Sequence, residues 1–118
     1  MSDARLSAAE RIRRRPEFVS VYADGSKTHG RYMTLFALNR GPGAGAGRFG
    51  VAATRKLGPA VVRNRAKRLA RELFRQNKAG PGIDLVVVPR REMLDASFAQ
   101  LRSDYRATLA RSQRVGRR

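Results

Sequence analysis

The segment from Ala60 to about Asn77 constrains the fold more than any other part of the chain. At the helical rotation of about 100° per residue, six apolar residues fall within one arc: Val62, Ala66, Leu69, Ala70, Leu73 and Phe74. Helix-breaking residues stand on both sides, with Gly58-Pro59 before the segment and Gly80-Pro81-Gly82 after it. The pattern predicts an amphipathic helix whose apolar face packs on a sheet.

Other segments show helix and strand patterns that are separated by turn residues. Helical spacing of apolar residues predicts helices at Pro16 to Asp24 and from Asp95 or Ser97 to about Leu109. Alternating or β-branched apolar residues predict strands at Arg31 to Asn39, Arg48 to Arg55 and Ile83 to Val88. The glycine-rich residues 41–47 predict a mobile hairpin connection between the first two strands.

The length of 118 residues suits one domain with a modest apolar core. Residues 1–15 carry the basic run Arg11, Arg13, Arg14 and Arg15 and predict a flexible basic arm. Residues 16–110 are expected to form the single α/β domain. Residues 111–118 return to Arg, Ser, Gln and Gly, which predicts a basic tail that is disordered without its partner.

The charge of the chain predicts a polyanionic partner. Lys and Arg total 26 against nine acidic residues, a formal net charge of +17, and self-repulsion of this size favours association with a polyanion. Nucleic acid and an anionic membrane surface both satisfy this requirement. The sequence lacks the roughly 18 consecutive apolar residues of a spanning helix and an apolar signal-peptide core. We therefore expect a cytoplasmic protein with no membrane partner.

The residue types that carry most protein catalysis and metal binding are scarce. The chain has no cysteine and one histidine, His29, which excludes a Cys/His zinc site and thiol catalysis. The acidic residues do not cluster as a metal-dependent nuclease would require. Each of three acidic residues has a structural interpretation instead of a catalytic one. Asp84 stands at a strand end, Glu72 lies within the basic helix, and Asp95 is a candidate helix cap. We expect no metal and no catalytic residue on this chain.

The face opposite the apolar stripe of the central helix is basic. It presents Lys67, Arg68, Arg71 and Arg75, flanked by Arg63 and Arg65, and holds one acidic residue, Glu72. A solvated helix surface usually interleaves both signs of charge for i,i+4 support. Guanidinium groups in a fixed array can instead grip phosphate oxygens in pairs. We interpret this face as a phosphate-binding surface, with a solvated charged face as the alternative.

The segment Ala60-Val61-Val62-Arg63-Asn64-Arg65-Ala66-Lys67-Arg68-Leu69-Ala70-Arg71 resembles the bacterial ribonuclease P protein subunit. In that family an Ala-x-x-Arg-Asn-Arg-x-x-Arg-x-x-Arg pattern lies on a helix after a strand that ends in paired basic residues, matched here by Arg55 and Lys56. The likeness covers most of residues 5 to 110. It implies an α+β fold, a two-layer α/β sandwich of order α-β-β-β-α-β-α with a four-stranded sheet and a left-handed β-α-β crossover.

The resemblance also implies partners and sites. The partners are ribonuclease P RNA, which would carry out catalysis with Mg²⁺, and precursor tRNA, with no protein partner required. It implies that the catalytic RNA is bound by the basic helix, through Arg63, Asn64, Arg65, Lys67, Arg68 and Arg71. A cleft between the sheet and this helix would receive the single-stranded 5′ leader of precursor tRNA, at Phe18, Tyr22, Phe36, Arg55 and Lys56.

The sequence departs from the family pattern at two aromatic positions, and the site residues and the function each have an alternative interpretation. Tyr22 stands where the family often has Phe, and Phe36 stands where Tyr is frequent, so a ring is kept at both positions. The aromatic residues could instead pack in the core, and Arg63, Asn64 and Arg65 could contribute to the fold. A ribosomal or architectural RNA-binding protein is the alternative function, and a membrane-surface protein would need a larger exposed apolar helix face.

Overall fold

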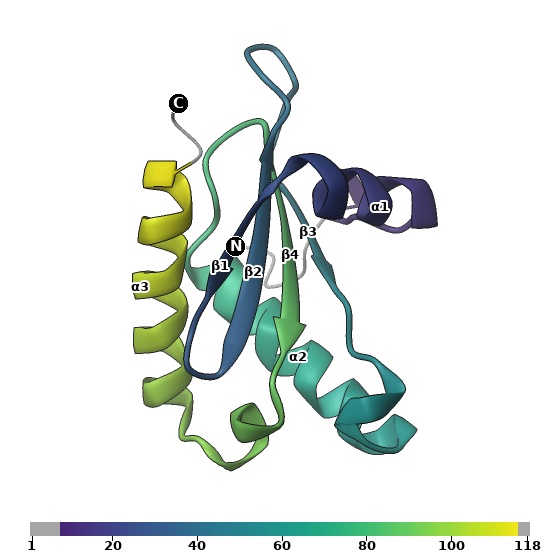
Figure 1. Ribbon diagram of the computed structural model, residues 1–118, viewed down its shortest axis with the longest axis vertical. Coiled ribbons are helices and arrows are strands. Elements are labelled where there is room, and N and C mark those ends of the chain that lie inside the picture. Colours follow the sequence, from purple (N-terminus) through teal and green to yellow (C-terminus); the bar gives the residue numbers. More distant parts are fainter. Residues whose placement is uncertain (1–7, 116–118) are drawn as a thin grey trace, which may run out of the picture.

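The computed structural model describes residues 8–115 and arranges three α-helices around a four-stranded sheet (Figure 1). The α-helices and strands are α1 (Arg15–Asp24), β1 (Ser26–His29), β2 (Met33–Asn39), β3 (Arg48–Val51), α2 (Ala60–Gln76), β4 (Ile83–Pro89) and α3 (Phe98–Val115). Short 3-10 turns stand between them, namely η1 (Ala8–Glu10), η2 (Arg55–Leu57) and η3 (Arg91–Asp95). The predicted order α-β-β-β-α-β-α is confirmed.

The sheet is mixed, with the strand order β1-β2-β4-β3. β2 is antiparallel to both of its neighbours, whereas β3 runs parallel to β4. Residue patterns predicted β2, β3 and β4 but did not reveal β1, because its four residues Ser-Lys-Thr-His are all polar. The second predicted strand also ends earlier than expected, at Val51 instead of Arg55.

The connection from β3 through α2 to β4 is left-handed, as the family resemblance implied. In Figure 1 both strands run downward, β4 lies to the left of β3, and α2 returns behind them. Connections between parallel strands of one sheet are right-handed in about 98% of cases. The handedness is therefore an unusual feature that places α2 and its basic surface behind the β3 edge.

The main core lies between the sheet and the helices α2 and α3. Phe74 of α2 is fully buried and stacks on Phe49 of β3, with ring centroids 4.7 Å apart. Tyr105 of α3 is also buried, and its hydroxyl donates a hydrogen bond to the Asn77 carbonyl at 2.9 Å.

Ser97 caps α3 through reciprocal hydrogen bonds with Gln100. Of the two predicted caps, Ser97 and Asp95, the structure therefore selects Ser97.

The opposite face of the sheet is only partly covered, by α1. Val21 of α1 packs there with Val86 of β4 and Ile12, while Leu85 and Val87 point into the main core. β4 is therefore buried on both faces, as its apolar run predicted. The remainder of the α1 face stays open beside the helix, and the candidate site lies there.

Parts of the predicted arm and tail are packed rather than free. The Ile12 N–H donates to the Phe49 carbonyl at 2.8 Å, and Ile12 is buried against α1. Residues 8–14 thus join the domain through a non-local contact that the basic composition did not indicate. At the other end α3 continues to Val115, and Ser112 is buried. The predictions for residues 1–7 and 116–118 lie outside the described residues.

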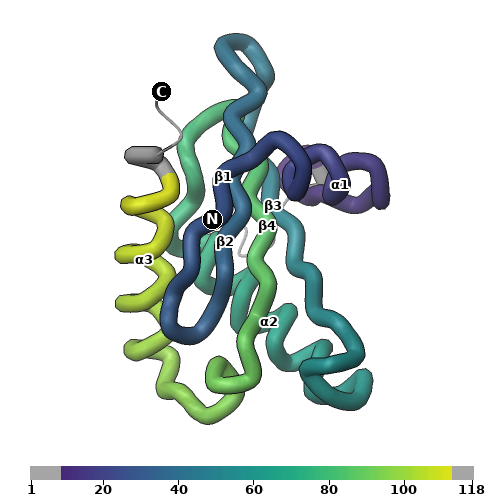
Figure 2. The backbone as a smooth tube through the Cα atoms, in the orientation of Figure 1, coloured from purple at the N-terminus to yellow at the C-terminus, as the bar shows by residue number. Residues whose placement is uncertain are grey.

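The glycine-rich connection projects from the end of the sheet, as the tube in Figure 2 shows between β2 and β3. The prediction of a hairpin was wrong, because β4 lies between these two strands. Gly41, Gly43 and Gly45 all have positive φ, a region that other residues rarely adopt. The loop is connected to the turn before β4 by a hydrogen bond from the Gly82 N–H to the Gly45 carbonyl.

Within residues 8–115, no helix is long and apolar enough to cross a bilayer.

Candidate nucleic-acid interface

Three aromatic rings meet on the open face of the sheet, at the side of α1. Phe18 and Tyr22 lie one helical turn apart, with ring centroids separated by 6.5 Å, and Phe36 of β2 meets Tyr22 edge to face at 4.9 Å. Tyr22 is 39% exposed, and burial raises the pKa of its hydroxyl, which therefore stays neutral at physiological pH. The three predicted aromatic residues thus form one cluster that is exposed at Tyr22, while Phe18 and Phe36 are half-buried and pack against the smaller core cluster.

Two hollows adjoin at Tyr22. The first runs between α1 and the residues after β3, and its lining comprises Arg13, Arg15, Phe18, Val19, Tyr22, Val51, Ala52, Ala53, Thr54 and Lys67. The second continues across the sheet and is lined by Tyr22, Lys27, His29, Thr34, Phe36 and Val88. Together they make a groove with ring faces in the middle and cations along its length, which suits an extended single-stranded nucleic acid.

A third hollow lies beside the β3 edge and is strongly cationic. Its lining includes Arg11, Arg13, Lys67 and Arg71 and no acidic side chain. Burial lowers the pKa of Arg71, and the nearby charges of Arg11 and Arg68 lower it further. These cations repel one another, so a phosphate between them would relieve the repulsion.

The basic face of α2 adjoins this hollow. Asn64, Arg65, Arg68 and Arg71 are exposed, and Lys67 reaches both cationic hollows. Arg63 is half-buried, and its Nε is buried without a hydrogen-bond partner among the described residues. Six predicted RNA-binding residues therefore lie on one helix, on its exposed side or at the edge of that side.

Arg75 differs from the other cations of this helix because an acidic residue neutralises it. Its guanidinium forms an ion pair with Glu72, in which the Nε donates to one carboxylate oxygen at 3.1 Å. This pair occupies the one acidic side chain of α2. The remaining basic residues of the helix are left available for phosphate.

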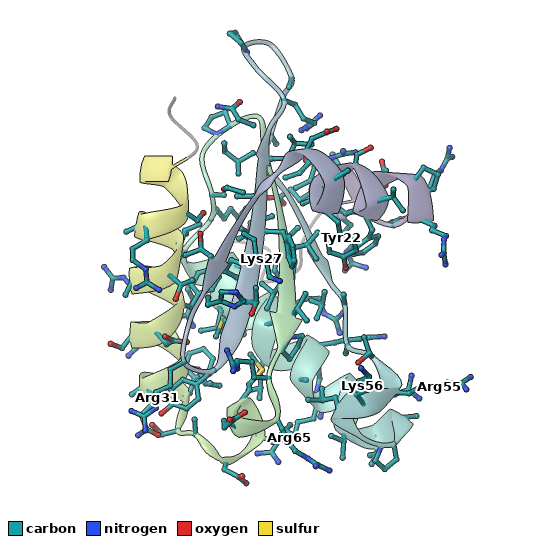
Figure 3. The ribbon with its side chains drawn as sticks, in the orientation of Figure 1. Tyr22, Lys27, Arg31, Arg55, Lys56 and Arg65 are labelled. Atoms are coloured by element: carbon teal, nitrogen blue, oxygen red, sulfur yellow. The ribbon has the colours of Figure 1, made fainter. Side chains whose placement is uncertain are left out.

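Arg55 and Lys56 do not join the aromatic cluster. Both are exposed on η2, next in sequence after Thr54 at the end of the first hollow, and Figure 3 shows them well apart from Tyr22. They extend the cationic path of the groove toward the start of α2. The structure therefore places the predicted leader-binding residues along a groove instead of around one point.

Two groove residues lie on β1, the strand that sequence reasoning did not recognise. Lys27 of β1 lies opposite Phe36 in the strand register, and its Nζ is 5.6 Å from the centre of that ring. His29, also on β1, has its Nδ1 3.3 Å from the Thr34 hydroxyl. Lys27 was missed because β1 was not recognised, and His29, which was interpreted as a surface or RNA-contacting side chain, was not placed in the groove for the same reason. Pairing the alternation Lys27-x-His29 with the next strand is the signal that could have found them.

Gly50 lines the third hollow and lies against the Phe18 ring. A methyl group at this position would lie 2.8 Å from two atoms of the Phe18 ring and 3.1 Å from the Ile12 Cβ. The ring of Phe18 therefore rests directly on the β3 backbone. This close approach requires glycine at position 50.

Comparison with known proteins identifies the family. The chain matches the ribonuclease P family over residues 6–113. It belongs to this family. The ribonuclease P protein component of Oleidesulfovibrio alaskensis is 43% identical over 90 residues, covering 75% of this chain and 72% of the relative. That of Citrifermentans bemidjiense is 36% identical over 118 residues, covering 89% and 99% of the two chains.

Solved structures of ribonuclease P proteins share the fold. The RNase P protein from Thermotoga maritima aligns with a TM-score of 0.76 at 32% identity, covering 86% of this chain and 96% of that one. The Staphylococcus aureus RNase P protein aligns with a TM-score of 0.74 at 27% identity, covering 86% and 93%. The family and fold that the Arg63-Asn64-Arg65 segment indicated are thereby confirmed.

Two buried or partly buried aspartates of this ribonuclease P family member have structural partners. Asp84 is paired with Arg40 and Arg48, and Asp104 accepts bonds from the backbone N–H groups of Arg31 and Tyr32. Over residues 8–115, no three His, Asp or Glu side chains gather in a way that could hold a metal ion. The geometry supports binding of phosphate and bases at the groove and at α2.

Proposed function

We propose that this chain is the protein subunit of ribonuclease P in the cytoplasm and promotes endonucleolytic removal of the 5′ leader from precursor tRNA. The observation that carries this proposal is the groove of Phe18, Tyr22 and Phe36, which leads directly to the basic face of α2. Ring faces bind unpaired bases, and fixed guanidinium groups bind phosphates. One side of the protein is thus suited to binding a single strand, and the adjacent side is suited to binding a structured RNA.

In this proposal the two surfaces bind different RNAs. The exposed residues of α2, with Arg63 at their edge, contact ribonuclease P RNA, and the groove holds the leader of precursor tRNA. The cations between them reduce the repulsion between two polyanions that must come together. Leader contacts would add affinity for the precursor that mature tRNA lacks, so the protein would also favour release of product.

We assign the hydrolysis itself to the RNA subunit, with Mg²⁺ bound mainly by that RNA. Support comes from the acidic residues of the chain, since Glu17, Glu72 and Asp84 are all engaged by arginine. Phosphodiester hydrolysis requires a metal site or a positioned acid and base. The protein contributes binding, orientation and charge neutralisation.

The proposal is tested by cleavage of precursor tRNA at low Mg²⁺ with a bacterial ribonuclease P RNA, with and without the protein. Substrates with a long leader and without a leader are compared. We expect the protein to restore cleavage and to tighten binding only when a leader is present. Equal binding of both substrates with unchanged cleavage would indicate a ribosomal or architectural RNA-binding protein instead.

Replacing Tyr22 by alanine should weaken binding of the long-leader substrate by about tenfold, because a base stacked on an aromatic ring contributes about 1–3 kcal/mol. Tyr22→Phe keeps the ring and should retain the affinity. Binding of the leaderless substrate should not change in either variant. Titration of both substrates into holoenzyme reconstituted with wild type and with each variant measures these affinities, and an equal loss for both substrates in Tyr22→Ala would contradict the assignment.

Gly50→Ala should reduce leader affinity without removing any RNA-contacting side chain. The added methyl group displaces the Phe18 ring, which lines the first hollow, since its contact at 2.8 Å is too close to persist. Gly80→Ala is the matched control, because a methyl group there meets nothing within 4 Å. Leader affinity is measured as for Tyr22, and an unchanged value in Gly50→Ala would show that Phe18 takes no part in binding.

A further inference from the structure

α1 carries two of the three aromatic rings of the groove but has little apolar anchoring. Val21 is its one fully buried side chain, whereas α2 buries Ala66, Ala70, Leu73 and Phe74. Phe18 packs in part against the same small cluster, and a short helix held by these two apolar contacts could rotate or slide on the sheet. Its orientation, and with it the position of Phe18 and Tyr22, must depend on further contacts.

Glu17 provides such a contact at the start of α1. Its Oε1 accepts bonds from the backbone N–H groups of Arg13 and Arg14, each at 3.1 Å, and its Oε2 accepts a bond from Arg48 Nη1 at 2.7 Å. The N–H groups of Arg14 and Arg13, followed by Arg48, lower the pKa of this carboxyl. Glu17 therefore stays ionised and joins the first turn of α1 to β3.

Arg48 continues this link into the centre of the sheet. Its Nε donates to Asp84 Oδ1 at 2.9 Å and its Nη2 donates to Asp84 Oδ2 at 2.7 Å. Asp84 lies on β4 and is only 2% exposed. A single planar guanidinium thus bridges a fixed carboxylate of the core and the carboxylate that caps α1, and lysine could not reproduce this geometry.

The other end of α1 is fixed by close backbone contact. A Cβ at Gly25 would lie 2.7 Å from the Ala37 carbonyl oxygen, so the chain leaves the helix directly against β2. Phe18 and Tyr22 lie between this contact and the Glu17 link. With both ends held, the two rings face the groove in one orientation.

We infer that the Glu17-Arg48-Asp84 link positions α1 for leader binding, with Arg48 as its central positioning residue. The inference rests on the proposed leader-binding function of the groove. Arg48 need not touch the leader, because its effect passes through Glu17 and the orientation of α1. The link also explains why one arginine is held between two acidic residues, although most cations of the chain face solvent.

The test uses the full chain with Glu17→Gln, which keeps an oxygen for the helix cap but loses the charge that holds Arg48. Glu72→Gln is the matched control, because it makes the same charge change in a surface ion pair of α2. Arg48→Lys is the second variant. Nuclear Overhauser contacts between the Tyr22 and Phe36 rings report the position of α1, and leader-dependent affinity reports its effect on binding.

We expect Glu17→Gln and Arg48→Lys to lose the ring contacts and to reduce the affinity gain from the leader by about tenfold, the value of one stacked base. Binding of ribonuclease P RNA should stay within twofold of wild type, and Glu72→Gln should change neither readout. Retention of the ring contacts in Glu17→Gln would overturn the inference. Absence of any leader effect in the wild type would instead refute the proposed function of the groove, while the ring contacts still decide the role of the link.

Discussion

Replacing both Arg68 and Arg71 by alanine is expected to weaken binding of ribonuclease P RNA by at least about 100-fold, because each charge-assisted bond contributes about 1.5–3 kcal/mol. Both side chains are exposed on α2, so the apolar face of the helix should remain packed. The slope of log affinity against log salt should also decrease in magnitude by about 2, one unit for each lost phosphate contact. Fluorescence anisotropy with labelled RNA over a series of salt concentrations measures both quantities.

The matched control removes two arginines that lie outside the proposed RNA surface. Arg75 is paired with Glu72, and Arg102 lies on α3 with its guanidinium 5.8 Å from the centre of the Phe98 ring. Arg75→Ala with Arg102→Ala lowers the net charge by the same amount, and we expect only a small loss of affinity. If both double variants bind equally weakly, total charge determines RNA binding and the α2 face has no special role.

Phe74→Ala should have the largest effect on stability, lowering the free energy of unfolding by about 3–5 kcal/mol. Phe74 is fully buried and loses both its place in the core and its stacking with Phe49. Such a loss is a large part of the total stability of a small domain, about 5–15 kcal/mol. Urea unfolding of the free protein, followed by far-UV circular dichroism, measures the change.

Val61→Ala serves as the control for this stability measurement. Val61 lies on the same helix but is 76% exposed, so its truncation should change the free energy of unfolding by less than about 0.5 kcal/mol. Similar effects of the two substitutions would contradict the packing of α2 on the sheet. The contrast tests the amphipathic pattern from which the helix was predicted.

The central helix was the most predictable part of both the fold and the site. Its apolar and basic residues recur at helical spacing within one continuous segment, so the sequence indicates both faces without knowledge of distant residues. Four of the six apolar residues are fully buried, and Val62 and Leu69 pack at the edge of the core. The family pattern around Arg63-Asn64-Arg65 then added the expected fold order.

The polar strand β1 and the packing of Ile12 were not predictable in the same way. β1 has no apolar alternation and forms through its register with β2, in which Lys27 pairs with Phe36. Ile12 stands among arginines and becomes buried by meeting Phe49 and α1. In both cases the structure depends on a partner segment that local composition does not reveal.

The sequence by itself determined the amphipathic central helix, the three apolar strands, the excess of positive charge and the family. Only the tertiary structure decided that Tyr22 meets Phe36, that Lys27 completes the groove and that Arg48 connects α1 to Asp84. The physical reason is the range of the interactions. Helical and strand periodicity arises between neighbouring residues, whereas the groove depends on strand order, register and helix placement between segments far apart in the chain.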